Sequence, residues 1–135
     1  MKVKDIFNTL FKLGLSSEKA ANFRVASALT YKKNIISLGT NSMKTDPFQK
    51  RFGSCDLAIC LHAEVAAIKN ALKILPIEEL KKCSLYILRV KQTKRNGDYV
   101  TGLSKPCAGC QRAIATFGIK HVFYTEDCQN DFVCL

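Results

Sequence analysis

The stretch CSLYILRVK, residues 83–91, decides how the rest of the chain can be arranged. Its nearly continuous apolar run predicts a central β-strand that is covered on both faces. After a turn at residues 95–98, a helix is expected from near Pro106-Cys107 to Gly118, because apolar residues recur at helical spacing and glycine ends helices. Residues 119–125, IKHVFYT, are expected to form a second strand.

The residues before the central strand predict a helix, a hairpin and another helix. Residues 3–13 have the apolar spacing of an amphipathic helix. Residues 24–40 are expected to form two short strands with a break at Lys32-Lys33-Asn34, which is typical of a hairpin. Residues 61–75, LHAEVAAIKNALKIL, again have helical spacing, and Pro76 ends that helix. This order predicts an α/β fold whose sheet has helices on both sides.

Length and composition are those of an ordinary globular chain. With 135 residues, of which 47% are apolar and 24% charged, we expect one domain over residues 1–135 with a core that needs no disulfides. Charged residues interrupt the first fifteen positions, and no apolar run approaches the roughly 20 residues of a membrane-spanning helix. The expectation is a cytoplasmic protein without membrane contact.

The chain is strongly basic, with 21 Lys and Arg against 11 Asp and Glu, a formal net charge of +10. Such a charge favours an anionic partner, either a nucleotide phosphate or a polynucleotide. A solvated basic surface without a dedicated ligand is the alternative.

Cysteine use indicates metal or catalytic chemistry. The chain has 7 cysteines, an odd number that argues against a complete disulfide framework. In a reducing cytosol, cysteines are more often metal ligands, catalytic groups or small buried side chains. Cys55 and Cys60 could mark a second zinc site, or they could be core or loop cysteines.

Two short motifs can supply a metal site. Cys107 and Cys110 begin a predicted helix three residues apart, so their sulfur atoms point the same way, and the helix dipole favours their thiolate forms. Alone, this pair could be a redox pair, half of a structural zinc site or two core cysteines. His62 also begins a helix, and its convergence with the cysteines would give zinc three protein ligands and leave a fourth position for water, as in catalytic zinc sites.

Glu64 lies two residues after the histidine. A carboxylate there could take a proton from water and deliver it to a ring nitrogen and then to a leaving amine. Glu64 could instead complement the helix dipole, and His62 could be a capping or surface histidine.

The full pattern is His62-Ala63-Glu64, then 41 residues, then Pro106-Cys107-Ala108-Gly109-Cys110. With it, the chain resembles the cytidine deaminase superfamily over about residues 24–125. The resemblance implies a three-layer α/β/α sandwich around a five-stranded mixed sheet. It also implies zinc bound by His62, Cys107 and Cys110, with Glu64 as the proton shuttle.

The resemblance suggests substrate contacts as well. Asn41 would contact a sugar, although an ordinary turn asparagine is equally compatible. Backbone groups at Ala63 and around Ser104 and Cys107 would hold the base and the attacking oxygen. Within residues 41–60, which we expect to form a loop beside the substrate, basic residues could meet a phosphate: Lys44, Lys50 and Arg51.

Residues 106–125 resemble the deoxycytidylate and tRNA-type branches, which implies that the strand at 119–125 lies parallel to the preceding one. Only ten residues follow Thr125, so the fifth strand is formed in an unusual way or the architecture is minimal.

Three functions follow from these observations. The first is deamination of a cytosine nucleoside or nucleotide to the uracil form, by a homodimer or homotetramer as the resemblance implies. The second is deamination of adenosine in tRNA or cytosine in single-stranded DNA, which the charge favours. The third is a non-catalytic zinc-binding scaffold, which the presence of Glu64 disfavours.

Overall fold

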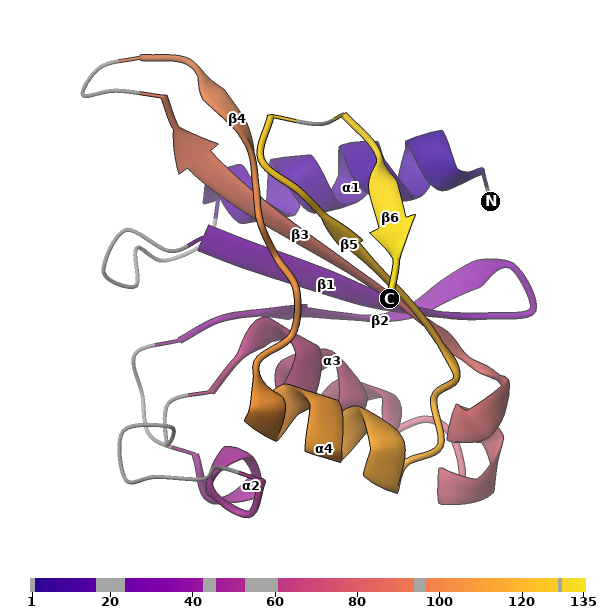
Figure 1. The fold of residues 1–135 in the computed structure, drawn as a ribbon. Helices are drawn as coiled ribbons and strands as arrows, with labels where there is room; N and C mark the ends of the chain where they lie inside the picture. The colour runs from indigo at the N-terminus through magenta and orange to yellow at the C-terminus, as the bar shows by residue number, and fades with distance from the viewer. Residues whose placement is uncertain (1, 17–23, 43–45, 53–60, 94–96, 129) are drawn as a thin grey trace.

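The computed structural model describes residues 2–16, 24–42, 46–52, 61–93, 97–128 and 130–135 (Figure 1). The elements in chain order are α1 (Val3–Ser16), β1 (Arg24–Tyr31), β2 (Asn34–Thr40), α2 (Pro47–Lys50), α3 (Ala63–Ala71), the 3₁₀ helix η1 (Ile77–Lys82), β3 (Ser84–Gln92), β4 (Tyr99–Gly102), α4 (Ala108–Thr116), β5 (His121–Thr125) and β6 (Phe132–Cys134).

β3 is the central strand, as its apolar sequence predicts. One edge pairs antiparallel with β1 along almost its whole length. The other edge is shared: its first half pairs parallel with β5, and its second half pairs antiparallel with β4. The parallel pairing of β3 and β5 confirms the predicted strand direction. Along β3, Leu85 and Ile87 are buried with one core cluster, and Leu88 and Val90 with the other, as expected for side chains that alternate between faces.

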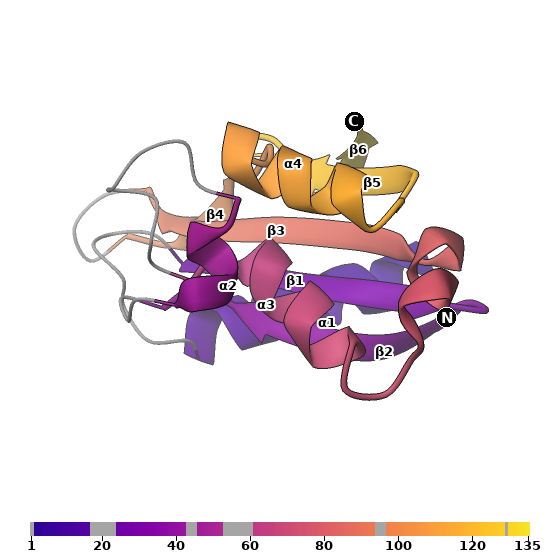
Figure 2. The same cartoon turned by 90° about the horizontal axis from the view of Figure 1, so that it is seen from below.

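The sheet is covered on both faces, so the predicted three-layer fold is confirmed (Figures 1 and 2). Helix α1 packs on one face, where Ile6 and Leu10 are almost fully buried. Helices α3 and α4 pack on the other face, where Ile68 and Ile114 join the larger core cluster. Burial of each such aliphatic side chain contributes about 1.5–3 kcal/mol, so both faces stabilise the sheet.

Within the described residues, the mixed sheet has six strands instead of the expected five. Five of them follow the order β2-β1-β3-β5-β6, and β4 joins beside β3. β6 resolves the question of the short C-terminal segment, because Phe132–Cys134 pair antiparallel with β5. Both β4 and β6 are too short to show a period in the sequence.

Two connections place the elements of the site. The β1–β2 hairpin turns at Lys32 and Lys33, within the predicted break, with φ angles of 51° and 67°. In β2, Gly39 lies so close to α3 that a Cβ atom there would be 2.4 Å from the Ala63 carbonyl oxygen and 2.5 Å from the Ala67 nitrogen. A side chain at residue 39 would therefore push the start of α3 away from the sheet.

Helix boundaries differ modestly from the expectations. α3 ends at Ala71, and residues 72–74 form turns before Pro76, so the predicted helix over 61–75 is too long. The short helix α2 lies inside the predicted loop. Residues 95 and 96 of the predicted turn lie outside the described residues. Within the described parts of the chain, no helix has the length and apolar character needed to span a membrane.

Candidate metal centre

The starts of α3 and α4 bring together the three ligands that the sequence predicts. His62 is the N-cap residue of α3, and Cys107 is the N-cap residue of α4, with Cys110 in the first turn. The Nδ1 atom of His62 lies 3.5 Å from the Cys107 Sγ atom and 3.3 Å from the Cys110 Sγ atom. The described residues contain no second group of three such side chains placed to hold a metal ion.

These distances fit a tetrahedral zinc ion. Zinc bonds of about 2.3 Å to sulfur and about 2.0 Å to nitrogen, at a tetrahedral angle, separate the two ligand atoms by about 3.5 Å. The ligand atoms of the three side chains lie within 4.8 Å of one another. Two sulfur donors with one imidazole are also the donor set that suits zinc better than magnesium or calcium. The prediction of zinc as the cofactor is therefore consistent with both geometry and chemistry.

Hydrogen bonds among the three predicted ligands shift the pKa of each one. Hydrogen bonds with Cys110 and His62 lower the pKa of Cys107 to about 3. Hydrogen bonding to Cys107, together with burial, raises the pKa of Cys110. The hydrogen bond with Cys107 also raises the pKa of His62. Because a metal ion binds thiolate and neutral imidazole, its binding to this group displaces protons.

Glu64 lies in the first turn of α3, two residues after His62. Its side chain is buried, with 6% of the residue exposed. This burial raises the pKa of the Glu64 carboxyl, and the opposing effect of His62 is smaller. A carboxyl group with a raised pKa is suited to both accepting and donating a proton near neutral pH.

Hydrogen bonds from other elements fix the start of α3. The Ser27 hydroxyl of β1 donates to the carbonyl oxygen of Ala63 across 2.6 Å. The backbone N–H of His62 donates to the side-chain Oε1 of Gln49 in α2 across 3.1 Å. Gln49 is fully buried, and its Nε2 group has no hydrogen-bond partner within the described ranges. Sequence reasoning missed Ser27 and Gln49, because a serine in a strand and a glutamine in an expected loop carry no motif.

Helix α2 is held against α3 and α4, the two helices that begin at the predicted zinc ligands. Asp46 caps α2 and accepts a hydrogen bond of 2.8 Å from Lys69 of α3. Arg112 of α4 donates to the carbonyl oxygen of Phe52. The rings of Phe48 and Phe52 pack against Phe117 at the end of α4. Polar and aromatic contacts thus hold the described part of this segment beside the metal centre. The sequence predicts that this segment lies near the substrate.

The predicted phosphate contacts in this segment are described only in part. Lys50 ends α2, and Arg51 follows with its guanidinium group 5.8 Å from the centre of the Phe48 ring. Lys44, Cys55 and Cys60 lie outside the described residues.

The predicted substrate contacts have structural partners. Asn41 continues the hairpin: its backbone N–H donates to the Val25 carbonyl, and its Oδ1 accepts from the Val25 N–H across 2.9 Å. Ala63 is fully buried at the start of α3. Ser104 is buried between strands, where its Oγ donates to the Ile87 carbonyl and its N–H donates to the Thr125 carbonyl, each across 2.8 Å. The roles of Asn41, Ala63 and Ser104 toward a substrate stay predictions.

Comparison with known proteins agrees with this geometry. Residues 2–126 match the family model described as the cytidine and deoxycytidylate deaminase zinc-binding region. No curated protein sequence matches the chain.

Two solved structures share the fold. One is the apo crystal structure of dCMP deaminase from the cyanophage S-TIM5, with a TM-score of 0.62 and 21% identity, covering 96% of this chain and 89% of that one. The other is guanine deaminase from Bacillus subtilis, with a TM-score of 0.58 and 23% identity, covering 93% of this chain and 65% of that one. At these identities the likeness concerns the fold.

Proposed function

Because the chain belongs to the cytidine and deoxycytidylate deaminase zinc-binding family, we propose that it removes the amino group of cytosine in a nucleoside or nucleotide. Water replaces the amine at the ring carbon, so the products are the uracil form and ammonia. We also propose that the enzyme acts in the cytoplasm as a homodimer or homotetramer.

One observation carries this proposal: two sulfur atoms and one imidazole nitrogen converge within 4.8 Å beside a buried glutamate. A purely structural zinc site usually has four protein ligands, whereas three ligands leave room for water. Bound zinc would supply a Lewis acid that makes water a stronger nucleophile. Metal binding alone would not require the neighbouring Glu64.

Glu64 is proposed as the catalytic residue that moves protons. Its carboxylate takes a proton from the attacking water and delivers it to the ring nitrogen of the base. It then takes the second proton of that water, now a hydroxyl on the ring carbon, and passes it to the amine, because an amine leaves readily only when it is protonated. The carbon–nitrogen bond breaks, ammonia leaves and the hydroxyl oxygen becomes the carbonyl of the uracil form. Burial around Glu64 supports this role, since it raises the pKa of the carboxyl above its ordinary value and so favours proton uptake.

The remaining groups are proposed to position the substrate. His62, Cys107 and Cys110 would hold zinc, and the backbone of Ala63 and residues around Ser104 would hold the base. Asn41 would contact the sugar, since it lies between the hairpin and the segment leading to α2. The basic charge of +10 supports a phosphorylated substrate or, as a second candidate, a polynucleotide.

The test is a panel of substrates with zinc-loaded wild type and Glu64→Gln. The panel contains cytidine, deoxycytidine, CMP, dCMP, dCTP, guanine, adenosine and a cytosine-containing single-stranded DNA, with amine loss followed by mass spectrometry. Turnover of a cytosine nucleoside or nucleotide is expected, and Glu64→Gln should lower it by about 100- to 10,000-fold with zinc still bound. Reaction of the DNA alone would favour the polynucleotide function. Reaction of guanine or adenosine alone would overturn the choice of base, and no turnover with zinc bound would favour a scaffold.

A further inference from the structure

The connection that leads to the cysteine ligands begins where β3 changes its neighbour. Along one edge of β3, Ile87 pairs parallel with Tyr124 of β5, and two residues later Arg89 pairs antiparallel with Gly102 of β4. Figure 1 shows the chain leaving β4 here and running to the start of α4. The way in which this junction is held therefore bears on the position of the first cysteine.

Two buried hydroxyl groups lie at the junction. Thr125 ends β5 and is fully buried, and Ser104, in the connection to α4, is 7% exposed. Their hydroxyl oxygens lie 3.0 Å apart. The Ser104 N–H donates to the Thr125 carbonyl, and the Thr125 N–H donates to the Ser104 hydroxyl, each across 2.8 Å. The pair therefore ties the end of β5 to the connection that precedes α4.

The same two hydroxyl groups bond the strands around them. The Thr125 hydroxyl donates to the Gly102 carbonyl across 2.8 Å and accepts from the Arg89 N–H across 3.2 Å. The Ser104 hydroxyl donates to the Ile87 carbonyl across 2.8 Å. One buried pair thus reaches β3, β4 and β5. Removing either hydroxyl would take a hydrogen-bond partner from buried backbone groups, which the fold tolerates poorly.

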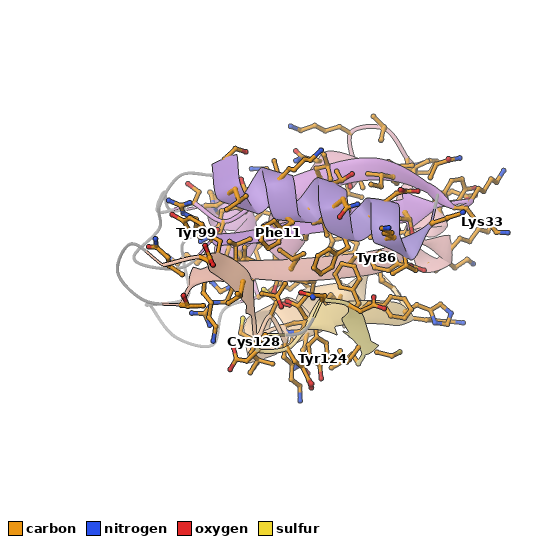
Figure 3. All side chains as sticks on the ribbon, turned by 90° about the horizontal axis from the view of Figure 1, so that it is seen from above. Phe11, Lys33, Tyr86, Tyr99, Tyr124 and Cys128 are labelled. Atoms are coloured by element: carbon orange, nitrogen blue, oxygen red, sulfur yellow. The ribbon has the colours of Figure 1, made fainter. Side chains whose placement is uncertain are left out.

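The segment after β5 also holds β4 and the residue that follows it. The backbone N–H of Cys128 donates to the Thr101 carbonyl across 2.8 Å, and the Asp127 carboxylate accepts from the Leu103 N–H across 3.2 Å. In Figure 3, which views the molecule from the α1 side, Cys128 lies on the side of the sheet where β5 and β6 are. Residues 101–104 are therefore held along their length by the end of β5 and the residues after it.

Little freedom remains between this junction and the first cysteine ligand. Ser104 lies three residues before Cys107. Pro106, which has a restricted φ angle, is buried between them, and its carbonyl accepts a hydrogen bond of 2.9 Å from the side chain of Gln111 in α4. The Cys107 sulfur in turn accepts from the Cys110 N–H across 3.4 Å. A displacement of Ser104 would therefore be passed on to the Cys107 sulfur.

We propose that Thr125 is a positioning residue of the zinc centre, whose hydroxyl acts through Ser104 to fix where Cys107 presents its sulfur. The inference rests on zinc binding by His62, Cys107 and Cys110, and not on which amine the enzyme removes. A threonine that only stabilised the sheet would affect the melting temperature alone. A positioning threonine also affects the affinity and the geometry of the bound metal.

Two substitutions at residue 125 separate the hydroxyl from the rest of the side chain. Thr125→Val removes the hydroxyl and keeps nearly the same shape, whereas Thr125→Ser keeps the hydroxyl and removes the methyl group. Thr125→Val should weaken zinc binding by about tenfold, as is typical of groups that orient metal ligands, and Thr125→Ser should stay within about threefold of wild type. Ser104→Ala breaks the same link from its other side and should also weaken binding. The double variant Thr125→Val with Ser104→Ala should lose little more than the more affected single variant, because both act through one pair.

Competition with a chromogenic chelator measures the zinc affinity, and the visible absorption of cobalt(II) bound in place of zinc reports the geometry of the thiolate ligands. Thr125→Val should shift the cobalt bands, and Thr125→Ser should restore them. Thr30→Val is the matched control, because it removes a buried hydroxyl of β1 that bonds the Ser84 carbonyl across 3.5 Å. This control should lower the melting temperature and leave the bands unchanged.

Unchanged zinc affinity and cobalt bands in Thr125→Val would overturn the proposal, and so would the same shift in Thr30→Val or a failure of Thr125→Ser to restore the bands. Ser104→Ala decides the question if Thr125→Val does not fold, since unchanged bands in that variant would likewise overturn it. Neither readout uses turnover. A wild type that binds cobalt but deaminates no substrate would refute the proposed function and leave this inference standing.

Discussion

The backbone N–H of His62 donates a hydrogen bond of 3.1 Å to the side-chain oxygen of Gln49, which is fully buried in α2. Helix α2 contributes none of the three predicted zinc ligands, but through this bond it holds the backbone of one of them, His62. The contact links α2 to the start of α3 through a side chain, and not through strand pairing or a disulfide.

Gln49→Leu should lower zinc affinity by about tenfold or more, because residues that orient metal ligands typically contribute this much. Competition with a chromogenic chelator, performed on folded protein, measures the change. Ser37→Ala is the matched control, since it removes a hydrogen bond of 2.9 Å to the Ala67 carbonyl, one turn further along the same helix. A loss of thermal stability without a change in zinc affinity for Gln49→Leu would contradict the positioning role.

Gly39→Ala tests the close approach of β2 to α3. The added methyl group would meet backbone atoms at 2.4 Å and 2.5 Å, and backbone cannot move aside as a flexible side chain can. We expect a loss of about 1–3 kcal/mol in the free energy of unfolding, together with weaker zinc binding. Urea unfolding and the chelator competition measure the two effects. The companion change Gly102→Ala meets only side-chain carbons of Arg89 and Lys91, the nearest at 3.1 Å, and should cost less.

Asp46→Asn should reduce stability in a pH-dependent way. The hydrogen bond from Lys69, supported by the N–H groups of Phe48 and Gln49, lowers the pKa of the Asp46 carboxyl. Because the pKa is lower in the folded state than in the unfolded chain, the stabilisation is complete above the ordinary aspartate pKa. It is lost as the pH falls through the lowered value.

At pH 7, Asp46→Asn should cost about 1 kcal/mol, mainly through loss of the charged contact with Lys69, because asparagine caps a helix about as well as aspartate does. Urea unfolding of wild type and variant at pH 7 and at several acidic values tests this, and the difference should shrink toward low pH. Asp98→Asn, at an exposed position just before β4, serves as the control. A difference that stayed constant with pH would show that the carboxylate charge has no part in the contact.

Cys110→Ser should abolish zinc binding at the centre, because it removes a buried ligand. Cys128→Ser, which changes an exposed free cysteine, should leave the zinc content unchanged. Metal analysis by mass spectrometry after dialysis gives the stoichiometry. Loss of the metal should also lower the melting temperature, because binding energy at a site formed by two helices stabilises the folded state. Zinc retained by Cys110→Ser would place a metal elsewhere and revive the question of Cys55 and Cys60.

The elements that the sequence predicts are those with long, regular patterns. The apolar run at 83–91 becomes β3, one residue displaced, and the hairpin and the starts of α3 and α4 lie where their patterns indicate. β4 and β6 were missed because they have only 4 and 3 residues and gain their stability from pairing with distant strands. Phe132 of β6, for example, packs edge-on against Phe7 of α1 and Tyr86 of β3, which no local pattern reveals.

The candidate site likewise contains residues that the sequence could predict and residues that it could not. His62, Cys107 and Cys110 were predicted because zinc ligands have characteristic residue types and spacing. Gln49 and Ser27 could not be predicted, since their hydrogen bonds to the start of α3 depend on tertiary packing and leave no trace in the spacing of residues.

The shared edge of β3 has a mechanical consequence for the metal ligands. Ser104 links β3 to β5 through its hydroxyl and N–H bonds just after β4 ends and just before α4 begins. We therefore expect this link to limit how far a change in the β3–β4 hairpin shifts Cys107. That hairpin is where a peptide tag or a fused domain could be inserted without disturbing the spacing of the three ligands.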